Sequence, residues 1–228
     1  RSAGRRSGAR VHGMCEPAWA LEGHPCPYGR KFNVPFSSMT WHAAPSALDY
    51  VAMAYSAMPF FAITALIVSI VVRRGLREVM ILPMLVAVDV LTRGLKAVFE
   101  QSRPVGTCLT SCGMPSGHSS FSMSLATLLL LEMHGRLRGQ QRLAASAAVA
   151  ALLLPVPWSR TQLHDHSVAQ AAAGSCCGVA TGILYFALLR FVLSPYLPAA
   201  AGRTTVLVDN YSRELSDMRE MQMETAPI

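Results

Sequence analysis

Three polar stretches interrupt an otherwise apolar chain, and their side chains could carry out phosphoryl chemistry. Together they supply three cations, two imidazoles and a glycine-containing turn. These groups can bind phosphoryl oxygens, attack phosphorus and protonate a leaving oxygen without a metal. The stretches are Lys96 with Arg103 and Pro104, then Pro115-Ser116-Gly117-His118, then Ser159-Arg160 with His166.

In the first stretch, Lys96 and Arg103 are separated by about two helical turns. Both cations can therefore face one side if the helix extends through Glu100. Pro104 disfavours helix at the residue before it, so we expect a loop to begin there. An ordinary surface helix, with Glu100 as the paired acid, is the alternative interpretation.

The second stretch directly precedes an apolar segment, so Ser116 or Gly117 is expected to cap a helix. The N–H groups at a helix N-terminus bind anions. His118 could protonate a departing oxygen there, because an unperturbed imidazole has a pKa of about 6.5. A capping turn with an incidental histidine would look the same.

The third stretch is expected in the loop between the fourth and fifth helices. Arg160 can bind phosphate oxygens through two parallel N–H donors, and an imidazole can attack phosphorus. Zinc binding is the alternative for its clustered titratable groups, but no thiolate or further histidine cluster supports it. We expect no metal and no other cofactor.

Composition indicates a membrane protein. The 228 residues are 52% hydrophobic and 14% charged, whereas soluble domains average about 25% charged residues. The net charge of +7 does not indicate nucleic-acid binding, because the arginines lie at the N-terminus, in short loops and in the site stretches.

Five apolar segments predict an all-α, polytopic bundle with about five transmembrane helices. They are residues 50–72, 79–96, 119–133, 143–154 and 167–193. We expect a membrane domain over 45–198, a basic, disordered segment or targeting peptide over 1–44, and a polar tail over 199–228. A disulfide between Cys108 and Cys112 is possible if their loop faces an oxidising lumen.

The five segments place all three polar stretches on one face of the membrane. The other face receives the turns 73–78 and 135–142, which are short and rich in arginine. Such turns favour the cytoplasm. We therefore expect the catalytic loops to be lumenal.

The three stretches resemble the signature motifs of the type 2 phosphatidic acid phosphatase superfamily over roughly residues 45–195. The resemblance implies that His166 is the nucleophile and His118 the general acid. It also implies phosphate binding without a metal by Lys96, Arg103, Ser116, Gly117 and Arg160.

Gln170 departs from the general family pattern, which has an aspartate there to orient the nucleophilic histidine. Its amide oxygen could accept a hydrogen bond from the ring, and Asp165 is an alternative orienting residue. The arrangement His166-x-x-x-Gln170 resembles the dolichyldiphosphatase branch and related plastid lipid phosphate phosphatases.

That branch implies hydrolysis of dolichyl or another polyprenyl diphosphate through a phosphohistidine. The activity would recycle the carrier lipid of N-glycosylation at the endoplasmic reticulum membrane. Two alternatives stay open. One is a phosphatidate or lipid phosphate phosphatase, possible in a plastid membrane. The other is a catalytically silent protein that binds lipid phosphates.

Overall fold

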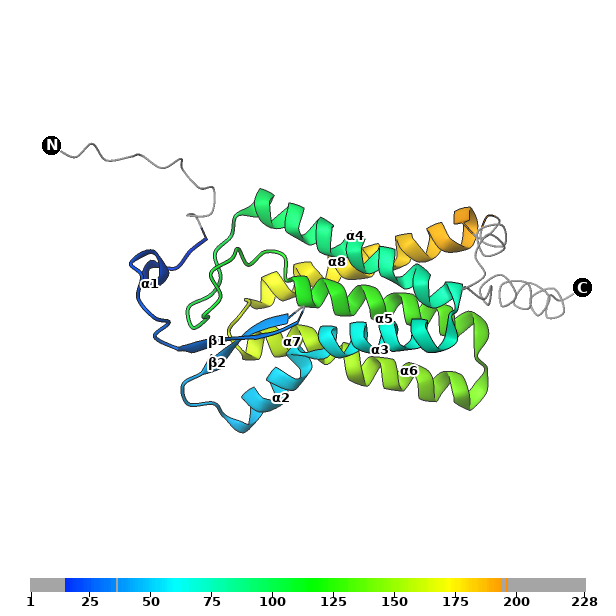
Figure 1. Ribbon diagram of the computed structural model, residues 1–228, viewed down its shortest axis with the longest axis horizontal. Coiled ribbons are helices and arrows are strands. Elements are labelled where there is room, and N and C mark those ends of the chain that lie inside the picture. The colour runs from blue at the N-terminus through cyan, green and yellow to red at the C-terminus, as the bar shows by residue number, and fades with distance from the viewer. Residues whose placement is uncertain (1–14, 36, 194–195, 197–228) are drawn as a thin grey trace, which may run out of the picture.

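The computed structural model describes residues 15–35, 37–193 and 196, and it is mostly helical (Figure 1). A two-stranded antiparallel hairpin, β1 (Gly29–Val34) and β2 (Ser37–His42), precedes the main helices. The helices are α1 (Ala18–Leu21), α2 (Ala47–Ser56), α3 (Met58–Arg73), α4 (Leu76–Phe99), α5 (Gly117–Arg136), α6 (Gly139–Leu153), α7 (Pro155–Gln162) and α8 (Val168–Ala187), which continues as the π-helix η2 (Leu188–Leu193).

The predicted membrane helical bundle is confirmed. Within the described residues, three helical segments are long and apolar enough to cross a bilayer: Ala47–Arg73, Gly139–Gln162 and Val168–Leu193. Helices α4 and α5 complete the bundle but do not meet that criterion, so the count of five spanning helices stays a prediction. Valines such as Val71 and Val72 on α3 are exposed, as expected for side chains that face lipid.

The closest helix packing joins α5 to α8 through small residues. Gly174, Gly178 and Gly182 recur every four residues on α8. A methyl group on Gly178 would collide with the main-chain oxygen of Ser120 on α5. Ser120 Oγ also donates a 2.9 Å hydrogen bond to the carbonyl oxygen of Gly174. Small residues at this spacing allow two helix backbones to approach each other closely within a membrane.

An apolar core fills the rest of the bundle and includes fully buried Met84 on α4 and Leu128 on α5. The hairpin, α2 and the loop between α4 and α5 lie at one end of this bundle (Figure 1). The turns that join α3 to α4 and α5 to α6 lie at the opposite end (Figure 1). The bundle therefore gathers the three polar stretches at one end, as the sequence predicted.

The expectation of a disordered N-terminal segment is wrong for residues 15–35 and 37–44. This part contains α1 and the hairpin, and two disulfides, Cys15–Cys112 and Cys26–Cys108, fasten it to the loop after α4. The suggested Cys108–Cys112 disulfide is wrong for the same reason, since each cysteine has a partner far away in the sequence. Residues 1–14 and the tail 199–228 lie outside the described residues.

The third polar stretch is also more helical than predicted. A new helix, α7, begins at Pro155, where a proline is tolerated because the first N–H of a helix has no intrahelical partner. Ser159 and Arg160 therefore lie on a helix that packs against α2 and α5, and not in a loop.

Candidate active site

Arg103 lies in the loop that begins where α4 ends. Glu100 caps that helix in a left-handed conformation, with φ of 42°, and turns the chain toward the end of the bundle. The guanidinium Nε of Arg103 donates to the carbonyl oxygen of Ser111 at 2.7 Å. Its Nη1 donates to the carbonyl oxygen of Asp165 at 2.7 Å and lies 2.9 Å from His166 Nε2. The first and third stretches therefore meet at this guanidinium.

His166 is buried, with 3% of its surface exposed. Because an arginine N–H can only donate, the contact with Arg103 requires an unprotonated Nε2 on His166. The ring proton of the neutral imidazole then resides on Nδ1, which is buried and has no hydrogen-bond partner among the described residues. The nitrogen that faces the cations is thus the one with a lone pair.

The surroundings also keep His166 neutral. Burial is the largest cause that lowers its pKa well below 6.5, followed by the charges of Arg103, Arg160 and Lys96. Neutral imidazole is the nucleophilic form. The pKa of Arg103 is itself lowered to about 10 by burial and by Arg160, so Arg103 stays charged at neutral pH.

Arg160 is completely buried and only partly satisfied. Its Nη2 donates to Asp165 Oδ2 at 2.9 Å and to the carbonyl oxygen of Ser38 at 3.0 Å. Its Nε and Nη1 have no partner among the residues described. Buried donors without acceptors are costly, so two such donors on one guanidinium indicate a site for an anion.

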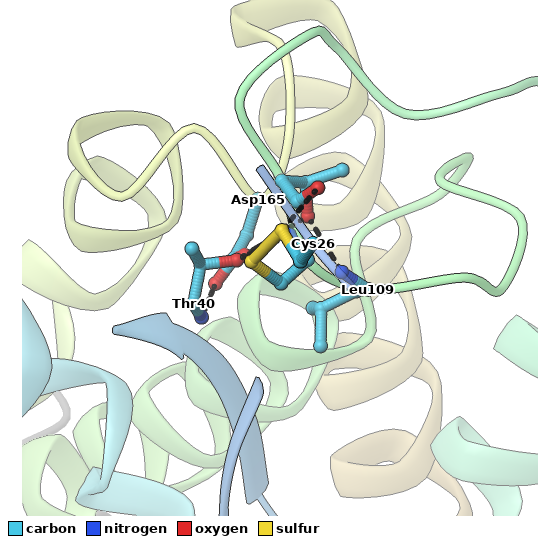
Figure 2. The surroundings of a disulfide bond; sticks show 6 residues. Cys26, Thr40, Leu109 and Asp165 are labelled. Carbon is cyan, nitrogen blue, oxygen red and sulfur yellow. Dashed lines mark hydrogen bonds between the residues drawn. A yellow bond between two sulfur atoms is a disulfide. The ribbon is translucent and has the colours of Figure 1, made fainter. Parts of the chain in front are cut away.

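Asp165 anchors Arg160 and the hairpin. Its carboxylate accepts hydrogen bonds from Thr40 Oγ1 at 2.6 Å, from Thr40 N at 3.3 Å and from Thr107 Oγ1 at 3.2 Å. Figure 2 shows this network beside the disulfide of Cys26. The carboxylate does not hydrogen-bond to the His166 ring in the structure, so its predicted orienting role is not supported.

Ser116 caps α5, as predicted, and its Oγ accepts a 3.4 Å hydrogen bond from Ser119 N. The next two residues, Gly117 and His118, begin the helix, where N–H groups have no partner within the helix. This 20-residue helix therefore presents its N-terminus at the site. His118 Nε2 lies 2.8 Å from Ser37 Oγ on β2.

Gln170 connects the three stretches instead of orienting the nucleophile. Its Nε2 donates to the carbonyl oxygen of Ser102 at 2.8 Å and to Gln101 Oε1 at 3.0 Å. Its Oε1 accepts from Ser167 N at 3.2 Å at the start of α8, and its carbonyl oxygen accepts from Ser116 N at 3.0 Å. These bonds engage the side-chain amide with the neighbouring loops, and His166 Nδ1 donates no hydrogen bond to it.

The structure thus brings the predicted residues to one place. Besides Arg103 and Arg160, the charge of Lys96 acts on His166 and helps to lower its pKa. Burial, followed by the charges of Arg160, Arg103 and Lys96, likewise lowers the pKa of His118 well below 6.5. Sequence reasoning missed the groups contributed by the hairpin and its neighbouring loop, which are Ser37, Ser38, Thr40 and Thr107. The sequence did contain one signal for this contact: two cysteines near the N-terminus, Cys15 and Cys26, could pair with the two in the loop, Cys108 and Cys112.

Several curated proteins are similar to this chain. Dolichyldiphosphatase 1 of Dictyostelium discoideum is 27% identical over 147 residues, which are 61% of this chain and 64% of the relative. Dolichyldiphosphatase of Saccharomyces cerevisiae is 24% identical over 72% of this chain and 76% of its own length. Lipid phosphate phosphatase gamma of Arabidopsis thaliana is 31% identical over 55% of this chain and 59% of its own length.

The chain thus spans slightly less than two thirds of the Dictyostelium relative. No solved structure matches it. Residues 77–193, which include every predicted site residue, match the PAP2 superfamily. On this match and the assembled site, the chain belongs to the PAP2 superfamily.

Proposed function

We propose that this protein is an integral-membrane lipid phosphatase that hydrolyses dolichyl or another polyprenyl diphosphate to the monophosphate and phosphate. The observation that carries the proposal is the buried Arg160, whose Nε and Nη1 lack partners among the described residues and whose charge acts on a neutral His166. A phosphoryl oxygen would satisfy those donors, and the imidazole supplies a nucleophile. The names of the relatives support the lipid diphosphate as substrate.

In the proposed reaction, Arg103 Nη1 shifts its hydrogen bond from His166 Nε2 to a phosphoryl oxygen. The freed lone pair of Nε2 then forms a bond to the terminal phosphorus. The bond from phosphorus to the bridging oxygen breaks, and that oxygen leaves with the electron pair as the lipid monophosphate. His118 takes up a proton when the anionic headgroup binds among the cations, and it gives that proton to the leaving oxygen. Water then attacks the phosphohistidine, His118 takes the proton of that water, and phosphate leaves as His166 is restored.

The cations of the site stabilise charge as it develops on the phosphoryl oxygens. Lys96, Arg103 and Arg160 act together with the N–H groups at the start of α5, where Ser116 and Gly117 lie. These fixed positive groups support metal-independent hydrolysis. The lipid chain lies in the membrane and sets the depth of the headgroup, so binding energy far from phosphorus orients the reaction.

We infer that the site faces the lumen of the endoplasmic reticulum. Two disulfides next to the site support an oxidising compartment, and the arginine-rich turns at the other end of the bundle support a cytoplasmic location for that end. Recycling of the carrier lipid for N-glycosylation follows from this location and substrate. The name of the Arabidopsis relative supports a lipid phosphate phosphatase as the second candidate.

The test is phosphate release in detergent with a chelator present, comparing dolichyl diphosphate, phosphatidate and lysophosphatidate. His166→Ala should lower turnover by at least about 10³-fold, since it removes the nucleophile. His164→Asn is the matched control. His164 is exposed and has φ of 54°, a backbone conformation that asparagine tolerates, so this variant should retain activity.

Each alternative has its own result in this assay. Hydrolysis of phosphatidate as fast as, or faster than, that of dolichyl diphosphate would favour the second candidate. Undiminished turnover by His166→Ala would overturn the phosphohistidine mechanism. If the wild-type protein released phosphate from none of the three lipids, the catalytically silent alternative would replace the proposal.

A further inference from the structure

We propose that Ser37, on the N-terminal hairpin, is a positioning residue that fixes the tautomer and orientation of His118. The inference rests on the proposed function, because it assigns how the acid of that reaction is held. It adds to the site a residue that lies outside the segment 77–193 matched to the superfamily. The transfer of the catalytic proton by His118 would therefore depend on β2, the strand that carries Ser37.

The hydrogen bonds around Ser37 define its role. Its Oγ lies 2.8 Å from the carbonyl oxygen of Ser56 and 2.8 Å from His118 Nε2. A carbonyl oxygen can only accept, so the single hydroxyl hydrogen of Ser37 must point toward Ser56. The remaining contact then requires a hydrogen on His118 Nε2, which donates to the lone pair of Ser37.

This assignment determines which nitrogen of His118 moves the proton. Neutral His118 carries its hydrogen on Nε2 and has a lone pair on Nδ1. When the ring is protonated, the Nε2 hydrogen stays engaged by Ser37, and the Nδ1 hydrogen is the one transferred to the leaving oxygen. In the second step Nδ1 accepts a proton from the attacking water, and the ring returns to its protonated form.

Ser37 can perform this role because its strand is held rigidly against the site. The carbonyl oxygen of the next residue, Ser38, accepts from Arg160, and Thr40 binds Asp165 through both its N–H and its hydroxyl group. Ser37 itself is buried, with 6% of its surface exposed. A rigid partner of this kind orients a functional side chain, as outer-shell residues do in metal sites.

The other partner of Ser37 is equally fixed. Ser56 ends α2, and its hydroxyl lies 3.0 Å from the Ser159 hydroxyl on α7, directly before Arg160. One buried chain of hydrogen bonds therefore links the proposed acid to the helix that carries the phosphate-binding arginine. The acid and the anion site are aligned by the same elements.

The test compares Ser37→Thr with Ser37→Val, which have nearly the same shape and differ in the hydroxyl group. Both β-branched side chains suit a strand. Each variant is assayed on lysophosphatidate, whose leaving alkoxide needs a proton, and on p-nitrophenyl phosphate, whose phenolate leaves without one. Ser122→Ala on α5 controls for the loss of a buried serine hydroxyl that bonds only to a main-chain oxygen.

Ser37→Val should lower kcat on lysophosphatidate by about 10- to 100-fold, which is typical of losing an orienting outer-shell partner. Its kcat on p-nitrophenyl phosphate should change less than about threefold, since that reaction does not depend on the acid. Ser37→Thr and Ser122→Ala should retain activity on both substrates. If Ser37→Val does not fold, the smaller Ser37→Ala carries the same comparison of substrates.

Two results would overturn the role of Ser37 and leave the proposed function intact. One is equal loss on both substrates, and the other is no difference between the threonine and valine variants while the wild-type protein is active. If the wild-type protein hydrolysed no phosphate ester or lipid diphosphate, the proposed function would fail and the role of Ser37 with it.

Discussion

The two regions of the molecule that form the site, the helical bundle and the cap, are stabilised by different interactions. The helical bundle, α2 to α8, is held by apolar contacts and by the close approach of α5 and α8. The cap, residues 15–35 and 37–45 with the loop 100–116, is held by two disulfides and a buried polar network. The bundle presents the nucleophile His166 together with Lys96 and Arg160, while the cap contributes Arg103 and the polar partners of Arg160 and Asp165.

The hydrogen bonding of the two regions differs in the same way. Buried hydroxyls within the bundle, such as those of Ser122 and Ser124, donate to carbonyl oxygens of their own helix. Where bundle and cap meet, Arg160 and His166 retain buried polar atoms without partners among the described residues. Native proteins leave few such atoms unpaired, and those that remain mark functional positions. The boundary between the regions is therefore where ligand binding is expected.

The largest effect should come from disrupting the bundle itself. Gly178→Ala places a methyl group against the main-chain oxygen of Ser120. Because this oxygen belongs to the backbone of α5, the clash can be relieved only by moving α5 away from its packed position. We expect a loss of about 1–3 kcal/mol in the free energy of unfolding. Gly178→Leu should prevent recovery of folded protein. Thermal unfolding in detergent and the yield of monodisperse protein measure both effects.

Gly94→Ala, on α4, is the matched control, because a methyl group at this position would have no neighbouring atom within 4 Å. It should leave stability unchanged or raise it by about 0.5–1 kcal/mol, as alanine favours a helix over glycine. Turnover per folded molecule should stay near the wild-type value in Gly178→Ala. Equal stability of the Gly178→Ala and Gly94→Ala variants would contradict the close packing of α5 and α8.

The second prediction concerns Gln170, which joins bundle and cap. Gln170→Glu keeps an oxygen that can accept from Ser167 N but loses the two donated hydrogen bonds to Gln101 and Ser102. It also places a carboxylate against both acceptor oxygens. Leaving buried hydrogen-bond partners unsatisfied costs about 1–3 kcal/mol. Because these bonds hold the loop that carries Arg103, we expect kcat/KM for dolichyl diphosphate to fall by about 10- to 100-fold.

The same variant distinguishes two roles for Gln170. If Gln170 oriented His166 by accepting from its ring, glutamate would accept as well or better, and kcat/KM would be retained or raised. Gln141→Glu, an exposed position at the start of α6, controls for the added charge. Undiminished activity of Gln170→Glu would therefore restore the orienting role.

Sequence alone predicted the bundle well, because its signal is local. Apolar runs located all five helical segments within a few residues, and the helix cap at Ser116 followed from the residue type. Residue type and order also predicted a shared site for Lys96, Arg103, His118, Arg160 and His166, which the structure brings together. Their catalytic roles stay predictions.

The cap could not be predicted in this way, because its stability depends on contacts that are distant in the sequence. Gln170 binds partners 68 and 69 residues away, and Thr40 binds Asp165 across 125 residues. Basic composition suggested disorder, yet cysteine pairing and a buried carboxylate order the hairpin. The prediction that the fourth helix ends near Pro155 is confirmed, since α6 ends at Leu153. The helix α7 that begins at Pro155 was missed, because a proline is also suited to the first position of a helix.

The third prediction tests whether the cap needs its covalent attachment. Replacing Cys26 and Cys108 together by serine removes a cross-link between residues 82 apart, which should cost the folded cap about 2–4 kcal/mol. Opening of the cap would release Ser37 and Thr40 from the site. The Cys15–Cys112 disulfide and the hydrogen bonds of Thr40 and Ser38 still hold the cap, so only part of this cost should appear in turnover. If about 1.4 kcal/mol of it appears, turnover decreases by roughly tenfold.

The measurement is turnover of the double variant relative to Cys176→Ser, which removes an exposed cysteine without a disulfide on α8. Protease cleavage within residues 15–35 should accelerate in the double variant alone. If turnover and cleavage match the control, the hydrogen bonds of Thr40 and Ser38 suffice to hold the cap, and the disulfides do not contribute to catalysis.

The smallest effect is expected from pH and concerns the nucleophile at the boundary of the two regions. Burial, then Arg103, Arg160 and Lys96, lower the pKa of His166 below 6.5, so the neutral ring persists as pH falls to that value. Since only the neutral ring can attack phosphorus, the acid limb of kcat/KM for p-nitrophenyl phosphate should have its midpoint below pH 6.5. An unperturbed histidine would already be half protonated at about that pH, a difference of at most about twofold there. Arg103→Gln removes the largest charge that lowers this pKa, so the limb should move toward higher pH as the overall rate falls. A limb that stays in place would show that the charge of Arg103 does not contribute to keeping His166 neutral.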